Sequence, residues 1–78
     1  MNAAQCKMAR AALGWGVRDL ATAAQVSTQT VTRFERGDRL KEPTIDILRS
    51  ALEAAGIEFI PENGGGAGVR FRKPSSGE

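Results

Sequence analysis

Polar side chains gather at the start of one helical pattern in this chain. Residues 27–30 read Ser-Thr-Gln-Thr, and Arg33 follows one turn after Gln29 on the same face. Glutamine can form two hydrogen bonds with adenine, arginine can bind O6 and N7 of guanine, and a threonine methyl group can contact thymine. These residue types at this spacing indicate a helix whose first turns read base edges in the major groove of DNA.

Positive charges cluster in the same region and again near the C-terminus. The first cluster, opposed only by Glu35 and Asp38, consists of Arg33, Arg36, Arg39 and Lys41. The second consists of Arg70, Arg72 and Lys73. Such clusters are compatible with phosphate contact and equally compatible with a solvated charged face. The formal net charge of +2 does not decide between these interpretations.

The composition argues against several other classes of protein. A chain of 78 residues has room for one small core and no second lobe to form a catalytic cleft. The single cysteine, Cys6, cannot form an internal disulfide, and the lack of histidine argues against a zinc finger or another structural metal site. Tyrosine is also missing, and no coherent set of acids, bases and nucleophiles is present. We therefore expect neither enzymatic activity nor a cofactor.

The hydropathy of the chain predicts its location. The N-terminus lacks the charged and then apolar run of a signal peptide, and no apolar stretch approaches the length needed to cross a membrane. We therefore expect a cytoplasmic protein with no membrane partner.

Four amphipathic segments must position the polar cluster. Helices are expected over residues 3–13 and 17–24, then from the Ser27 cap to Gly37, and from Pro43 to Gly56. The apolar residues recur at helical spacing and should form one core: Cys6, Ala9, Leu13, Leu20, Ala21, Ala24, Val26, Val31, Phe34, Ile45, Leu48 and Leu52. Trp15 also suits the core better than a stacking platform for bases.

The segment after Gly56 has a different pattern. Residues 57–61 and 68–72 alternate apolar and polar side chains, and the glycine-rich stretch between them predicts a hairpin loop. Glu58 is expected to oppose Arg70 or Arg72. A lone two-stranded ribbon is only marginally stable in water, so this one must pack on the helices or pair with another chain. Residues 74–78 are expected to be a disordered tail.

Residues 5–56 resemble the Cro/repressor-type helix-turn-helix family, also called the Xre family and typified by lambdoid phage repressors. The pattern that carries the resemblance is L-A-x(4)-V-S-x(3)-V-x-x-F-E-x-G, which runs from Leu20 to Gly37. The chain has Gly16 and Val17 where the family commonly has serine and glutamine. It has Gln25 where the family commonly has a glycine, so a positive φ there would carry modest strain.

The resemblance implies a role for individual residues. Candidates for base contact are Thr28, Gln29, Thr32 and Arg33, and a solvent-facing helix surface is the alternative for them. Candidates for phosphate contact are Lys7, Arg10, Ser27, Arg36, Arg39 and Lys41. Ser27 suits an N-cap better, although a capping hydroxyl can also reach a phosphate. Arg10 and Glu35 are the family's ion pair between the first and third helices.

The fold class that follows is mainly α. We expect a four-helix lambda-repressor-like helix-turn-helix domain over residues 1–56, followed by a β-hairpin over residues 57–73. The hairpin is a candidate dimerisation element through Ile57, Phe59, Ile60, Val69 and Phe71. Packing of the hairpin on its own helices and contact of Arg70, Arg72 and Lys73 with flanking DNA are the alternatives.

The expected function is sequence-specific binding of double-stranded DNA by a transcriptional regulator. A repressor that binds a palindromic operator as a homodimer fits best, because one small domain makes too few base contacts for strong discrimination. Two alternatives stay open. One is the antitoxin of a toxin–antitoxin pair, which has a protein partner, and the other is a protein-interaction module that does not bind DNA.

Overall fold

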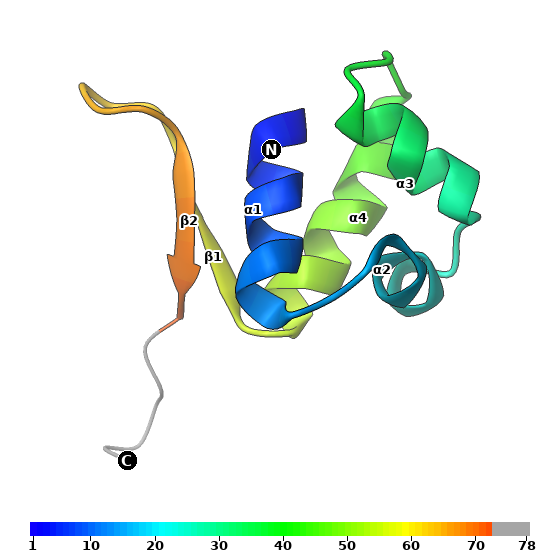
Figure 1. Ribbon diagram of the computed structural model, residues 1–78. Helices are drawn as coiled ribbons and strands as arrows, with labels where there is room; N and C mark the ends of the chain where they lie inside the picture. Colours follow the sequence, from blue (N-terminus) through cyan, green and yellow to red (C-terminus); the bar gives the residue numbers. More distant parts are fainter. Residues whose placement is uncertain (73–78) are drawn as a thin grey trace.

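The computed structural model describes residues 1–72, which form four helices followed by a two-stranded hairpin (Figure 1). The mainly α fold with a C-terminal hairpin is therefore confirmed. The elements are α1 Ala3–Leu13, α2 Val17–Ala24, α3 Thr28–Glu35, α4 Glu42–Ala54, β1 Ile57–Ile60 and β2 Gly68–Phe71. Lys73 and the tail expected over residues 74–78 lie outside the described residues.

Local signals place the ends of the helices that carry the turn motif. The backbone N–H of Gly16 donates to the Asp19 carboxylate at 2.8 Å before α2 begins. The hydroxyl of Ser27 accepts from the N–H of Thr30 at 3.1 Å, which confirms Ser27 as the N-cap of α3. Between them Gln25 has φ 58°, so the turn uses the left-handed conformation where the family commonly has glycine.

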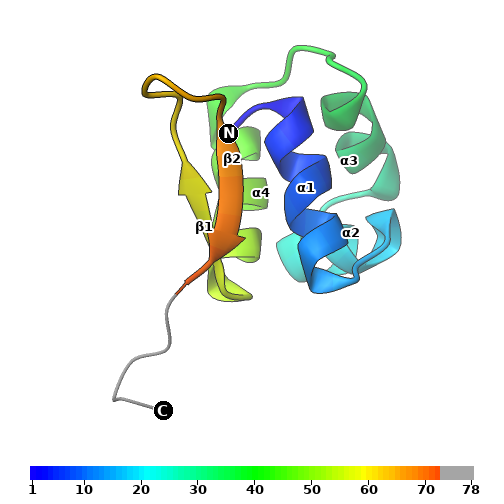
Figure 2. The same cartoon turned by 60° about the vertical axis from the view of Figure 1, so that its left-hand side comes forward.

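The core lies where α1, α2, α3 and α4 meet. Its largest fully buried side chains come from all four helices and from β1, and they are Cys6, Leu20, Val31, Leu48, Leu52 and Ile57. Leu13, Trp15, Val26 and Ile45 are partly buried and pack against this cluster, as the apolar spacing predicts. Figure 2 shows α1 lying between the hairpin on one side and α3 on the other.

The hairpin packs on the protomer's own helices. The strands are antiparallel with Ile57 opposite Phe71 and Phe59 opposite Val69, so these four side chains share one face. Phe59 and Val69 pack against the core, and Ile57 is only 1% exposed. Ile57 therefore has almost no surface to offer to a second chain in this arrangement.

A residue that the sequence did not single out also joins the hairpin to the helices. The side-chain amide of Gln5 donates to the carbonyl of Ile60 at 3.2 Å and to that of Gly68 at 3.0 Å. One buried side chain of α1 thus joins both strands. Each strand ends one residue before the expected position, at Ile60 and Phe71.

Candidate nucleic-acid interface

One face of α3 is exposed along its whole length. Val31, Phe34 and Glu35 turn inward, and the opposite face carries the base-contact candidates Thr28, Gln29, Thr32 and Arg33, all of them exposed. The amphipathic spacing of the helix makes this division, because apolar side chains recur every three residues. Figure 1 shows this helix at the outside of the molecule, on the side away from the hairpin.

The four candidates differ in how free their polar groups are. The Thr32 hydroxyl donates to the carbonyl of Thr28 at 3.0 Å, so its proton is already engaged within the helix. Thr32 keeps a methyl group and an acceptor oxygen for a partner. Gln29 and Arg33 are the two residues of this face with several side-chain donors. On chemical grounds they are therefore the strongest candidates for base contact on this face.

An ion pair holds α3 against α1. Arg10 donates through Nε and Nη2 to the two oxygens of Glu35 at 2.7 and 2.6 Å, and its Nη1 donates to the Trp15 carbonyl at 3.2 Å. The ion pair that the resemblance implies is thus present. A bidentate pair of this kind fixes direction as well as distance. Its effect is to set the angle at which α3 presents its exposed face.

The same contact includes the buried thiol of Cys6. Its Sγ lies 3.1 Å from Oε2 of Glu35, and burial together with this hydrogen bond raises the pKa of Cys6 to about 12. Burial on its own would raise the pKa of Glu35 as well. The hydrogen bonds from Arg10 and Cys6 and the charges of Arg10 and Lys7 outweigh it, so the pKa of Glu35 is below its usual value. Glu35 therefore stays ionised in the folded protein.

A basic concavity lies beside the exposed face of α3, between that helix and the start of α4. It has a volume of about 320 Å³ and is lined by Thr30, Arg33, Arg39, Leu40, Lys41 and Thr44. The structure thus brings together one base-contact candidate and two phosphate-contact candidates. The N-terminus of α4 opens here without a side-chain cap, but it adds little positive potential, because Pro43 has no N–H and the N–H of Thr44 donates to the carbonyl of Lys41 at 3.0 Å.

The remaining phosphate-contact candidates have different surroundings. Arg10 is held by Glu35, as described. Arg36 is exposed and donates to Asp38 at 3.0 Å. Lys7 is exposed on α1, and Ser27 is exposed at the N-terminus of α3 while serving as its cap.

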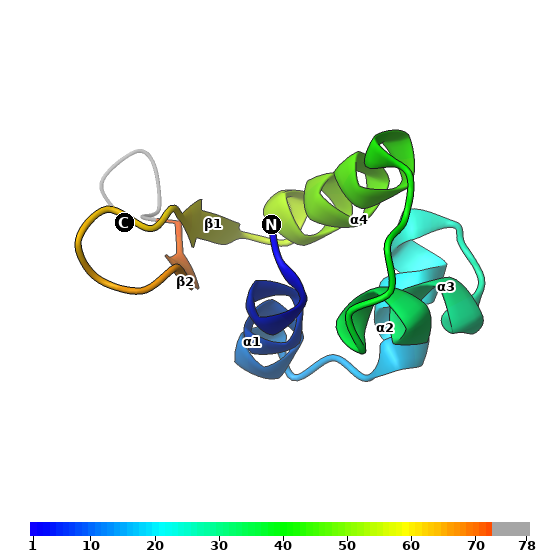
Figure 3. The same cartoon turned by 90° about the horizontal axis from the view of Figure 1, so that it is seen from above.

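The basic residues of the hairpin lie away from α3. Arg70 pairs with Glu58 at 3.1 Å, as the alternation of the strands predicts, and Arg72 donates to the Glu53 carbonyl. Figure 3 shows the hairpin at one end of the molecule and α2 with α3 at the other. This placement separates Arg70 and Arg72 from the exposed face of α3. Lys73 is outside the described residues.

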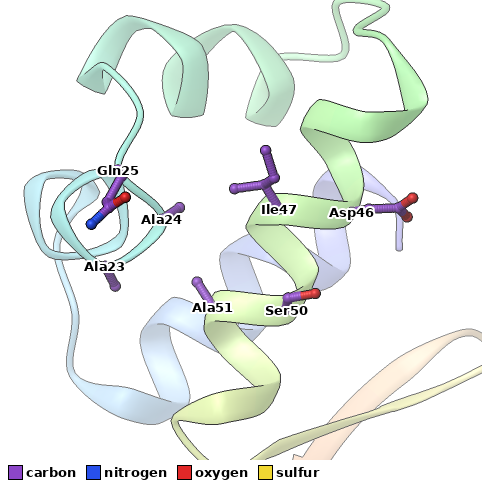
Figure 4. A pocket seen from close by; sticks show the side chains of 7 residues that line it. All are labelled: Ala23, Ala24, Gln25, Asp46, Ile47, Ser50 and Ala51. Carbon is purple, nitrogen blue, oxygen red and sulfur yellow. The ribbon is translucent and has the colours of Figure 1, made fainter.

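A second, shallow groove lies between α2 and α4 (Figure 4). Its lining is Ala23, Ala24, Gln25, Asp46, Ile47, Ser50 and Ala51. Ile47 is 47% exposed in this groove, and Asp46 is paired with Arg49 at 2.8 Å.

Within residues 1–72 no group of histidine, cysteine and acidic side chains is arranged to hold a metal ion. Over the same residues no helix is long and apolar enough to span a membrane.

Comparison with known proteins gives one family. A model described as a helix-turn-helix domain matches residues 3–59, from the start of α1 into β1. No curated protein matches the chain. The matched segment contains both the exposed face of α3 and the ion pair that orients it.

Proposed function

Because this chain belongs to the helix-turn-helix domain family, a fold typical of DNA-binding regulators, we propose that it is a transcriptional regulator of the Cro/repressor type. It binds double-stranded DNA in a sequence-specific way with α3 in the major groove, and it acts as a repressor in the cytoplasm. The proposal assigns no catalytic step to the chain. The observation that carries it is the exposed face of α3, with Gln29 and Arg33 pointing away from a helix braced by the Arg10–Glu35 pair.

The dimensions of α3 suit the groove. An eight-residue helix is about 12 Å long, which is about the width of the major groove of B-DNA. Gln29 and Arg33 are one turn apart, about 5–6 Å, so they reach neighbouring base pairs. We assign Gln29 to adenine and Arg33 to guanine, with Thr28 and Thr32 contacting the methyl groups of flanking thymines.

Phosphate contacts hold the helix in the groove. Arg39 and Lys41 line the basic concavity beside α3 together with Arg33, so this concavity receives a backbone phosphate. Lys7, Arg10, Ser27 and Arg36 are assigned to further phosphates. Binding through several such contacts must weaken steeply as the salt concentration rises, because counterions are released from DNA.

The operator is a palindrome bound by two copies. Two recognition helices on one face of B-DNA lie about 34 Å apart, or a multiple of that distance. Two recognition helices double the number of base contacts that a single α3 makes.

The test is selection of bound duplexes from a random pool by the wild type, by Arg33→Ala and by Arg49→Ala. Arg49 is the matched control, because it is 42% exposed, similar to the 46% of Arg33, and is paired with Asp46 on α4. We expect wild type and Arg49→Ala to select the same palindrome. Arg33→Ala should relax the preference for guanine at one position of each half-site, with a loss of about 1–3 kcal/mol in discrimination against the other bases.

Two results would contradict the proposal. Failure of the wild type to select any sequence at low salt would support the protein-interaction module instead. Selection of the same motif by Arg33→Ala would remove Arg33 from the base contacts.

A further inference from the structure

An acidic residue lies among the arginines at the end of α3. One oxygen of Asp38 is 3.6 Å from Nε of Arg33 and 2.8 Å from Nη2 of Arg36. Asp38 therefore places a negative charge on a surface that is otherwise basic and that faces DNA in the proposed function. A carboxylate at this place repels the phosphates of DNA, so it weakens binding unless it also contributes to recognition.

The main chain holds Asp38 in this position. Gly37 has φ 98°, which lets the chain turn back over the last turn of α3. The N–H of Gly37 donates to the carbonyl of Phe34 at 3.1 Å, and the N–H of Asp38 donates to that of Arg33 at 3.0 Å. This pair of bonds is the Schellman arrangement of a helix end. Asp38 is thus tied by its backbone to the residue whose side chain it meets.

The geometry of the Arg33 contact leaves the outer end of the guanidinium free. The nitrogen nearest to Asp38 is Nε, so the two terminal nitrogens, Nη1 and Nη2, still carry donors that can point outward. Two parallel N–H groups are what O6 and N7 of guanine accept. Arg36 donates to the same oxygen of Asp38 and keeps the pKa of that carboxyl below its usual value, so the acceptor stays ionised.

We propose that Asp38 is a positioning residue for base readout: its charge, 3.6 Å from Nε of Arg33, attracts the guanidinium so that the terminal nitrogens are aimed at guanine. This inference rests on the proposed function of α3. In the specific complex the contact between Asp38 and Arg33 is kept, and less side-chain freedom is lost on binding. On DNA of the wrong sequence, Asp38 keeps Arg33 from a phosphate and repels the backbone. Asp38 thus favours the correct site and disfavours the others.

The experiment compares the affinities of wild type, Asp38→Asn and Asp38→Ala for the selected operator and for a duplex of scrambled sequence. Removing the charge should tighten binding to the scrambled duplex about two- to fivefold, because one repulsion of phosphate is lost. Binding to the operator should weaken about two- to fivefold, because DNA alone must then order Arg33. The ratio of the two affinities should therefore fall about tenfold. The preference for guanine at the Arg33 position should relax.

The matched control is Asp46→Asn, which removes a carboxylate paired with Arg49 at 2.8 Å on α4. It should leave the affinity ratio unchanged. In an Arg33→Ala background, Asp38→Asn should shift both affinities alike, so the ratio there should also stay the same. A charge effect without positioning would shift both affinities alike in both backgrounds, so the ratio would not fall in the wild-type background either.

The outcomes separate this inference from the function on which it rests. If the wild type selects an operator but Asp38→Asn keeps its affinity ratio and its guanine preference, Asp38 does not position Arg33. If the wild type selects no operator, the proposed function itself has failed. Unchanged melting temperatures of the two Asp38 variants confirm that any loss is one of readout.

Discussion

Glu35 joins packing and charge in one side chain. It is 7% exposed at the end of α3, and it accepts hydrogen bonds from Arg10 and Cys6. Removing one partner of such a pair leaves the other charge buried and unpaired. The loss of stability is then larger than when both partners are replaced by apolar residues. The orientation of α3 therefore depends on whether Glu35 carries its charge.

The stability contribution of Glu35 must depend on pH with a definite sign. Its folded pKa is lowered, so the contribution is fully present above the unfolded value of about 4.5 and is lost as the pH falls through the folded value. Glu35→Gln should lower the free energy of unfolding by about 2–3 kcal/mol at pH 7. The difference between wild type and variant should narrow as the pH falls below 4.5.

Urea unfolding of both proteins at neutral and acidic pH measures this difference. Glu58→Gln is the control, because Glu58 pairs with Arg70 on the exposed face of the hairpin and its removal should change stability little. If the difference in the free energy of unfolding between wild type and Glu35→Gln stays constant down to acid pH, the ionised pair is not the source of that difference.

At the scale of elements, the attachment of the hairpin rests on Gln5. Its carbonyl oxygen accepts from the N–H of Asn2 and closes the N-terminus of α1, while its amide nitrogen bonds both strands. The two ends of one side chain thus serve two different elements. They can be separated by substitution.

Gln5→Glu should release the hairpin and keep the cap. A carboxylate retains an acceptor for Asn2, but it faces the carbonyls of Ile60 and Gly68 with an oxygen in place of a donor. We expect a loss of about 1–3 kcal/mol. Hydrogen exchange should become faster at the Arg72 amide, which bonds the Gly56 carbonyl at 2.8 Å.

Asn2→Ala is the converse variant. It removes the cap, which should lower the stability by about 1 kcal/mol. Hydrogen exchange of the hairpin, relative to that of the helices, should be the same as in the wild type. Equal exchange at Arg72 in wild type and Gln5→Glu would show that apolar packing alone holds the hairpin.

The helices could be predicted from the sequence because their signals are local. Gly14, Ser27 and Gly37 act within one turn of the ends that they define. The docking of the hairpin could not be predicted in the same way. The alternation of apolar and polar residues showed that Ile57 and Phe59 must be buried. It did not show that α1 and α4 bury them, because the periodicity of a helix does not indicate which strand packs on it.

The candidate site was predictable to a similar degree. Periodicity alone identifies the exposed face of α3, and that face is where Gln29 and Arg33 lie. The approach of Asp38 to Arg33 was not predictable, because the two are brought together by the reversal of the chain at Gly37 and not by helical spacing.

At the scale of the whole molecule, α3 and the hairpin occupy opposite ends. A hairpin at this distance from α3 is free to meet a second copy while α3 is on DNA. The apolar surface that the hairpin leaves uncovered is chiefly Phe71, which is 59% exposed. We therefore place the proposed dimer contact at the C-terminal end of β2, in preference to the buried residues of the hairpin.

Phe71→Glu should convert the dimer to a monomer, because a charge at the centre of an apolar contact is costly to desolvate. Ile47→Glu is the matched control, since Ile47 is 47% exposed in the groove between α2 and α4. Sedimentation equilibrium should show a monomer for the first variant and a dimer for the second. The opposite result would move the contact to that groove, and a monomeric wild type would exclude the homodimer.

The contact between α1 and α3 has one more consequence. Cys6 is the only cysteine of the chain, is completely buried, and has its pKa raised to about 12, so the folded protein shields it from alkylating reagents. A reagent reaches this sulfur only when α1 separates from α3. The rate at which a reagent alkylates Cys6 therefore reports how often the contact between α1 and α3 opens.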